Sequence, residues 1–130
     1  MAELNVGDAV PELRETPDKY LPHRYAGASG DFNPIHIDDE FAKAVGLPRN
    51  ILHGLYSMGL VAKANAALAG GDPRALKRLS VQFRGMGMPE QEIVVSGTVK
   101  SAEGGRVVVD TVAAQGETEI IKNAEAEVQL

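Results

Sequence analysis

Several features on which protein functions commonly rest are absent from this chain of 130 residues. It contains no cysteine, which excludes disulfide bonds, thiolate metal sites and a catalytic thiol. It has no excess of positive charge either, because 18 acidic residues outnumber 13 basic ones and the net charge is −5. Binding to nucleic acid is therefore not expected, since phosphate neutralisation needs a positive surface. This balance is still compatible with a small anionic ligand held by a few local basic side chains.

The chain also lacks a long apolar run. The longest such stretch, residues 60–69, contains Lys63 and Asn65 and is much shorter than the roughly 20 residues that span a bilayer. Residues 1–6 carry neither the basic segment nor the apolar run of a secretory signal. From these absences we expect a cytoplasmic protein that does not bind membranes.

What remains is the composition of an ordinary globular protein. Hydrophobic residues make up 44% of the sequence and charged residues 24%, which excludes disordered and low-complexity classes. The length suffices for one hydrophobic core but not for two domains of ordinary size. Because the sequence contains no repeat, linker or composition break, we expect a single domain over residues 1–130.

The spacing of apolar residues predicts helices in the first half of the chain. Residues 18–28 favour a short helix with Asp18 as its N-cap, although Pro22 indicates a distorted or late start. A second helix is expected over residues 38–45, where acidic side chains fill the first turn and suit the helix dipole. A third and longer helix over residues 54–68 has little polar face, so it should be mostly buried.

Farther along, the period of the apolar residues changes to two, which is typical of strands. Strands are expected at residues 79–83, 92–101, 106–114 and 118–129, with a shorter one near residues 8–10. Glycine-containing turns at residues 103–105 and 115–117 would join neighbouring strands as hairpins. Helices followed by an antiparallel meander predict an α+β protein whose sheet curls around the buried helix.

The residues best suited to catalysis are gathered in one loop segment, residues 30–36. Asp31, Asn33 and His36 place an acid, an amide and an imidazole within six positions. A turn at Asn33-Pro34 can direct the acid and the imidazole into one pocket, and Asn33 can fix that turn by bonding to its own backbone. Such a pair suits general acid–base chemistry, because imidazole titrates near neutrality. The composition alone leaves an ordinary surface loop as the alternative.

The order of these residues is more specific than their composition. The string G-D-x-N-P-x-H at residues 30–36, preceded by Y-A-G-x-S at residues 25–29, resembles the motif of the MaoC-like, (R)-specific enoyl-CoA hydratase (hydratase 2) family. An acidic helix and then a Leu-His-Gly helix start at residues 52–54 follow, as they do in that family. Within it, the chain looks most like catalytic subunits of bacterial (3R)-hydroxyacyl-thioester dehydratases. The resemblance covers roughly residues 5–130 and is specific over residues 25–60.

The resemblance implies the hot-dog fold, an antiparallel sheet around one long helix, and a hydro-lyase activity in fatty-acid metabolism. Asp31 and His36 would bind and activate water for reversible syn addition to a 2-enoyl thioester, giving the (3R)-hydroxyacyl thioester. Asn33 and Ser57 would support this pair. The backbone N–H of Gly54 would hold the thioester oxygen, because helix N-termini offer unpaired donors. Which member of the pair acts as the base stays open.

Other polar residues carry weaker indications. His53 either helps to set the loop around the thioester oxygen or makes only structural bonds, and the second interpretation is favoured. His23 is expected at the surface. The three histidines lack the spacing of metal ligands, so we expect no metal. Ser57 lies one turn after the predicted helix start, where packing alone is the alternative to a place in the pocket.

The substrate would be carried on coenzyme A or an acyl carrier protein, and no separate cofactor is expected. Arg84 and Lys63 are candidates for binding its phosphates, although surface charge is the simpler explanation for each. Four further basic candidates are Arg49, Lys77, Arg78 and Lys100. Residues 85–89, Gly-Met-Gly-Met-Pro, predict a bulge or bend at a sheet edge with methionine available for an adaptable apolar pocket. Relatives are usually richer in valine and proline here, which leaves acyl-chain specificity open.

Two alternative functions and the assembly state are also left open. A non-catalytic acyl-thioester-binding hot-dog subunit is disfavoured by the presence of Asp31, Asn33 and His36. A hot-dog thioesterase would need a carboxylate on or near the central helix, and residues 54–68 contain no Asp or Glu. A dimer is expected because an open sheet leaves edge strands to be covered. It would be a homodimer or a heterodimer with a related hot-dog subunit.

Overall fold

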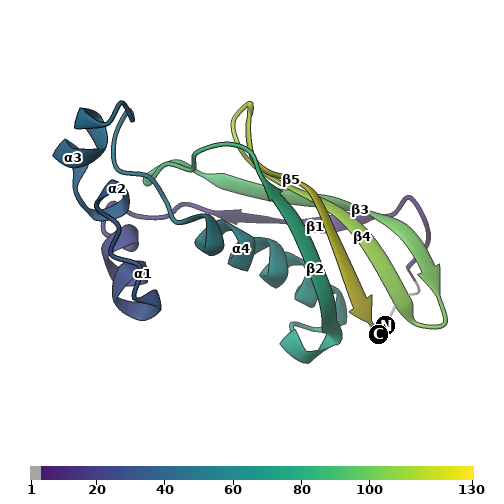
Figure 1. Cartoon of the computed structure of the whole chain (residues 1–130). Helices are drawn as coiled ribbons and strands as arrows, with labels where there is room; N and C mark the ends of the chain where they lie inside the picture. Colours follow the sequence, from purple (N-terminus) through teal and green to yellow (C-terminus); the bar gives the residue numbers. More distant parts are fainter. Residues whose placement is uncertain (1–3) are drawn as a thin grey trace.

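The computed structural model describes residues 4–130, and its centre is one long helix, α4 (Gly54–Ala66), against a five-stranded antiparallel sheet (Figure 1). The strands are β1 (Ala9–Glu15), β2 (Leu76–Phe83), β3 (Ile93–Glu103), β4 (Arg106–Gln115) and β5 (Thr118–Gln129). Figure 1 shows the sheet arching over α4. This arrangement confirms the predicted α+β hot-dog architecture. Residues 1–3, which belong to the segment considered for a signal and to the predicted domain, lie outside the described residues.

The strand order in the sheet is β1-β3-β4-β5-β2. The last three strands form the predicted meander, but β2 lies beside β5 at one edge rather than beside β3. The chain after β2 therefore crosses the end of the sheet before β3 begins. That crossing segment, residues 84–92, contains the glycine- and methionine-rich stretch. It begins with the predicted bend at the sheet edge, where the N–H groups of Arg84 and Gly85 both donate to the Ile120 carbonyl oxygen, at 3.0 and 3.3 Å. The residues after Gly85 then leave the sheet.

The first strand is longer than the sequence predicted. It continues past residues 8–10 to Glu15 and pairs with β3, with an irregularity in register between Val10 and Leu13. Pro11 and Glu12 are exposed at this irregularity. An edge strand tolerates proline and outward charge, because one side of its backbone has no partner strand. Pro11 and Glu12 interrupt the alternation of apolar and polar residues from which strands were predicted, so the predicted strand was too short.

The core lies between α4 and the inner face of the sheet. Val61 and Ala64 of α4 pack against Val95 of β3 and Ile121 of β5, and all four are buried. The expectation of a mostly buried helix is confirmed on this side. Gly97 of β3 is needed for close packing, since a Cβ there would lie 2.8 Å from the carbonyl oxygen of Asp110 on β4.

The first helix, α1 (Leu21–Ser29), begins later than residue 18, as Pro22 indicated. Proline fits the first turn of a helix because no intrahelical hydrogen bond is required of its nitrogen. The expected N-cap was wrong: Tyr20 occupies that position, and the carboxylate of Asp18 accepts from the Tyr20 N–H at 2.8 Å. Asp18 thus orders the approach to the helix rather than its first turn.

Two short helices follow α1 and were only partly predicted. The turn expected at Asn33 is instead the start of a one-turn helix, α2 (Pro34–Ile37), and Asn33 caps it by accepting from the Ile35 N–H at 3.1 Å. The next helix, α3 (Asp39–Ala44), was predicted, and Asp38 is its N-cap. In Figure 1 these three helices gather at the end of the molecule where α4 begins.

The central helix ends slightly earlier than predicted. Its last turn tightens into a 3₁₀ helix, η1 (Ala67–Ala69), and a second one, η2 (Pro73–Ala75), leads into β2. Among residues 4–130, no helix is long and apolar enough to cross a membrane.

Candidate active site

The imidazole of His36 is held in one orientation by the backbone around it. The ring sits on α2, and its Nδ1 lies 2.8 Å from the carbonyl oxygen of Ile51. A carbonyl oxygen only accepts, so Nδ1 carries a proton, and in the neutral ring the free lone pair is on Nε2. The side-chain amide of Asn50 donates to the His36 carbonyl oxygen at 2.9 Å and fixes the backbone below the ring. The structure therefore directs Nε2 of His36 away from the Ile51 carbonyl and toward Asp31.

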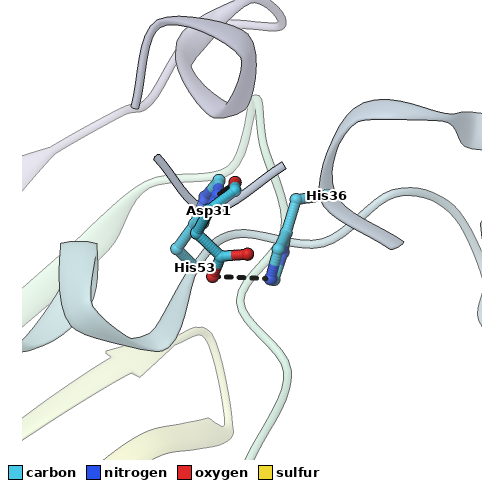
Figure 2. Close-up of side chains that lie close together, drawn as sticks. All are labelled: Asp31, His36 and His53. Atoms are coloured by element: carbon cyan, nitrogen blue, oxygen red, sulfur yellow. Dashed lines mark hydrogen bonds and ion pairs between the residues drawn. The ribbon is translucent and has the colours of Figure 1, made fainter. Parts of the chain in front are cut away.

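The carboxylate of Asp31 faces that nitrogen. Asp31 follows Gly30, which ends α1 in the left-handed conformation with φ of 82° and so turns the chain sharply. Its Oδ1 accepts from the Asn33 N–H at 3.2 Å, and its Oδ2 lies 3.9 Å from His36 Nε2 (Figure 2). That separation is too long for a direct hydrogen bond and suits a water molecule bonded to both groups. The Asp31 side chain is 53% exposed and that of His36 only 10%.

His53 connects both members of this pair. Its Nε2 lies 3.0 Å from the carbonyl oxygen of Asp31, to which it donates. Its ring stacks on that of His36, with centroids 3.9 Å apart and planes inclined by 21°, while the Tyr25 ring lies 4.6 Å away. The residue is buried, and its Nδ1 has no hydrogen-bond partner within residues 4–130. These are structural bonds of the kind favoured from the sequence, but they bear directly on Asp31 and His36.

The same three residues could be considered as metal ligands. Asp31, His36 and His53 each offer one ligand atom, and these atoms lie within 4.8 Å of one another. Imidazole binds a metal through a lone pair in the ring plane. Two stacked rings direct these lone pairs along nearly parallel planes, so one ion cannot lie in both. The arrangement favours proton transfer over metal binding, and the expected absence of a metal stays a prediction.

Two cavities meet beside this group. The more open one has a volume of about 290 Å³ and is lined by Tyr25, Ser29, Asp31, His53, Gly54, Leu55 and Phe83. The more enclosed one has a volume of about 170 Å³ and is lined by His36, Ile51, Leu52, Gly54, Ser57, Phe83, Gly85, Met86, Gly87, Ile120 and Ile121. Gly54 and Phe83 belong to both walls. The acid therefore faces one cavity and the imidazole the other.

The N-terminus of α4 lies at this junction. Its N-cap, His53, makes no side-chain capping bond, and the first N–H groups of a helix have no intrahelical acceptor. A Cβ on Gly54 would lie 3.1 Å from the Phe83 ring, so glycine keeps the wall between the cavities open. Ser57, one turn later, is buried and lines the enclosed cavity beside His36. Backbone donors and an acid–base pair are thus brought to one place.

The basic residues considered for phosphate binding lie elsewhere. Lys63 pairs with Glu15 at 3.3 Å, and Arg84 bonds to the side chain of Gln82 at 2.7 Å. Neither lines either cavity, and the same holds for Arg49, Lys77, Arg78 and Lys100. Their phosphate role stays a prediction. His23 is exposed, as predicted.

Three contributors to the site were missed from the sequence. Phe83 ends β2 and separates the cavities, while Asn50 and the Ile51 carbonyl hold His36. A phenylalanine at a strand end carries no sequence signal for a pocket. A backbone carbonyl carries none at all, because every residue has one.

Known proteins share both the sequence pattern and the fold. The family model for the MaoC like domain matches residues 9–121. Peroxisomal enoyl-CoA hydratase 2 of Arabidopsis thaliana is 41% identical over 103 residues, which are 78% of this chain and 31% of that protein. This chain thus spans about a third of that relative's length.

Two solved structures are similar over nearly the whole chain. A MaoC-like dehydratase superposes with a TM-score of 0.92 at 32% identity, covering 98% of this chain and 41% of the other. The (R)-hydratase from A. caviae involved in PHA biosynthesis has a TM-score of 0.88 at 22% identity, with 100% and 99% covered. The second likeness concerns the fold alone. Because the family match includes the segment that carries Asp31, His36 and Gly54, the chain belongs to the MaoC-like family.

Proposed function

We propose that this chain is a hydro-lyase that adds water reversibly to 2-enoyl thioesters and forms (3R)-hydroxyacyl thioesters. The observation that carries the proposal is the 3.9 Å separation between Asp31 Oδ2 and His36 Nε2 beside the N-terminus of α4. The name of the plant relative, an enoyl-CoA hydratase 2, points to the same reaction.

The two side chains would act on one water. Both present acceptors, the carboxylate of Asp31 and the unprotonated Nε2 of His36, and a water has two O–H donors. Held by both bonds, its oxygen would be free to attack C3 of the thioester. The pair would take one proton from this water and deliver a proton to C2 on the same face, so that the product gains one water in total.

The developing charge would be stabilised by the start of α4. As C3 is attacked, negative charge moves through C2 to the thioester oxygen. The Gly54 N–H has no intrahelical acceptor and lies at the positive end of the helix dipole. A preorganised donor of this kind favours the transition state over the ground state. The reaction consumes only substrate and water, so the proposal includes no cofactor beyond the thioester carrier, coenzyme A or an acyl carrier protein.

A direct assay tests this function. Purified protein is mixed with crotonyl-CoA, and the loss of the conjugated thioester absorbance is followed for the wild type, Asp31→Asn and His36→Ala. Each variant should be slower by about 10²–10⁴-fold, the usual contribution of general acid–base catalysis. Full activity in both variants would refute the roles assigned to the pair. Saturable binding without turnover by the wild type would support a binding subunit, and release of free thiol would support a thioesterase.

We also propose that two hot-dog subunits associate. Support comes from β2, an edge strand that pairs with β5 on one side and, among residues 4–130, with no strand on the other. Most of its side chains are exposed. A homodimer is the simpler assembly, and light scattering on the chain expressed alone measures it. A persistent monomer or aggregate would point to a related partner subunit. The cytoplasmic location expected from the sequence stays a prediction that cell fractionation tests.

A further inference from the structure

The enclosed cavity behind His36 has a buried, apolar floor. Leu52, Ile120 of β5 and Ile121 of β5 form it, and they are only 4%, 2% and 0% exposed. Ser57 is the one hydroxyl on its wall, and Met86 stands at the rim with 44% of its surface exposed. A cavity with an apolar, buried floor favours an alkyl group over a charged or solvated one.

Gly87 determines how deep this cavity is. A Cβ on Gly87 would lie 3.1 Å from Leu52 Cδ1 and 3.5 Å from Ile120 Cδ1, so a side chain would enter the space between two residues of the floor. Gly87 does not have a positive φ, so its backbone conformation does not require glycine. Its carbonyl accepts from the Leu52 N–H at 2.8 Å, which fixes this wall to the loop before α4. Glycine at position 87 therefore leaves room in the cavity and is not required by the backbone conformation.

Gly85, two residues earlier, has a different reason to be glycine. A Cβ there would lie 2.8 Å from the carbonyl oxygen of Glu119, a backbone atom of β5 that cannot move aside. Gly85 thus lets the loop lie close to β5, and Gly87, two residues later in the same loop, leaves the cavity free of a side chain.

The two cavities divide the substrate between them. The carrier arm of a thioester must continue to solvent, because coenzyme A or a carrier protein is attached to its far end. The enclosed cavity cannot pass such an arm through its buried floor, whereas the cavity beside Asp31 is more open. With the thioester carbon at Gly54 and C3 at the acid–base pair, the acyl chain beyond C3 enters the cavity behind His36.

Resting on the proposed function, we infer that this protein acts on short-chain 2-enoyl thioesters and that Gly87 determines the length limit. The cavity of about 170 Å³ is close in size to an apolar cavity of about 150 Å³ that binds one benzene molecule, so it has room for roughly five carbons beyond C3. Five carbons beyond C3 set an upper limit of about eight carbons. Longer chains meet the floor formed by Leu52 and Ile120.

The test measures kcat/KM for 2-enoyl-CoA substrates of four, six, eight, ten, twelve and sixteen carbons. Wild type, Gly87→Ala and Gly87→Val are compared, with Gly59→Ala as the matched control. Gly59 lies in α4, does not line either cavity and has open space around the position of its Cβ. Circular dichroism checks that each variant folds.

The wild type should prefer substrates of up to eight carbons and fall at least tenfold by twelve. Gly87→Val adds three carbons to the pocket and should lower kcat/KM for eight carbons by at least the roughly 10–200-fold that one methylene can cost, while the four-carbon value falls much less. Gly87→Ala should give a smaller shift in the same direction, and Gly59→Ala none. Equal activity of the wild type on four and sixteen carbons, or equal losses at all lengths in a folded Gly87→Val, would overturn the inference.

The wild-type profile needs no variant, so it tests the length limit even if Gly87→Val does not fold. Failure of the length limit is also distinct from failure of the proposed function. If the wild type hydrates all chain lengths equally and Asp31→Asn abolishes that activity, the length limit is overturned but the proposed function is not. Absence of hydration at every length in the folded wild type overturns both.

Discussion

The stacked imidazoles of His36 and His53, with centroids 3.9 Å apart, connect the two members of the Asp31–His36 pair through one residue. His53 contacts His36 through its ring face and Asp31 through a hydrogen bond of 3.0 Å to the Asp31 carbonyl. A displacement of His53 would therefore move both groups. Positioning of this kind is energetically important, because a misplacement of about 1 Å can cost about 10²-fold in rate.

Two substitutions of His53 test its ring stacking on His36 and its hydrogen bond to Asp31 one at a time. His53→Phe keeps an aromatic ring against His36 but removes the donor to Asp31, while His53→Gln keeps a donor and removes the ring. We expect both to lower kcat by about 10–100-fold and to change KM much less, since the substrate is bound mainly by other residues. Steady-state kinetics with crotonyl-CoA measures this division. Unchanged kcat in both folded variants would show that neither contact positions the pair.

Gly54→Ala tests the wall shared by the two cavities. Its Cβ would lie 3.1 Å from the Phe83 ring, which is half-exposed and can move outward. Stability should change little, but the displaced ring should narrow the site and reduce kcat/KM by about tenfold or more. The double variant with Phe83→Leu should recover most of the loss. No recovery would mean that the methyl group acts on the helix N-terminus itself rather than through Phe83.

Acid should loosen the segment that carries His36. Asp39 accepts from the Asn50 N–H at 3.0 Å, and the side chain of Asn50 donates to the His36 carbonyl. The hydrogen bond from Lys43, followed by that from the Asn50 backbone, holds the pKa of the Asp39 carboxyl below its usual value. A carboxyl with a lowered pKa in the folded state stabilises the fold above its unfolded pKa, and this contribution is lost as pH falls below about 4.

Asp39→Asn should remove this contribution while keeping an oxygen that accepts from Asn50. We expect the variant to lose thermal stability less steeply than the wild type between about pH 5 and pH 3, where carboxylates of this kind titrate. Melting temperatures across that range measure the difference. Parallel curves for the two proteins would show that the Asp39 pair contributes nothing to the pH dependence. Asp72→Asn gives a comparison away from the site, because the pKa of Asp72 is also lowered, by its pairing with Arg74, and this variant should flatten the curve in the same sense.

Gly97→Ala tests the close approach of β3 and β4. The new Cβ would lie 2.8 Å from the Asp110 carbonyl oxygen, a backbone atom within a paired strand. Overpacking of this kind typically costs about 1–3 kcal/mol. Urea denaturation should show a lower midpoint, with Thr98→Ala on the exposed neighbouring position as the control. An unchanged midpoint would mean that β3 and β4 can move apart to admit the methyl group at little cost in stability.

The sequence predicted features that depend on local pattern and missed those that depend on distant contacts. The strands at β3, β4 and β5 alternate regularly, and α4 is apolar on most sides, so both were predictable. The place of β2 beside β5 was not, because pairing across the sheet leaves no mark on β2 itself. Likewise β1 was shortened by outward polar residues that suit an edge.

The site divides in the same way. Asp31 and His36 were predictable from a motif whose order is specific, and the Asn33 bond to its own backbone is confirmed, although as the cap of α2 rather than as a plain turn. No local pattern in the sequence predicts the other contributors, which lie 14 to 47 positions beyond His36: Asn50, the Ile51 carbonyl and Phe83. The cavity behind His36 depends on residues without a side chain, and a glycine in sequence does not reveal which space it leaves free.

The start of α4 has a thermodynamic consequence. Ser, Asp and Asn are strongly preferred at this end of a helix, where a capping bond contributes about 1 kcal/mol, but α4 begins at His53 without such a bond. A thioester oxygen bound at Gly54 would serve this helix as its capping group. Substrate and fold would then stabilise each other, and an unreactive acyl-CoA analogue should raise the melting temperature by an amount that grows with the logarithm of its concentration divided by its Kd. The N-terminus of α4 would then receive its capping group from the bound thioester.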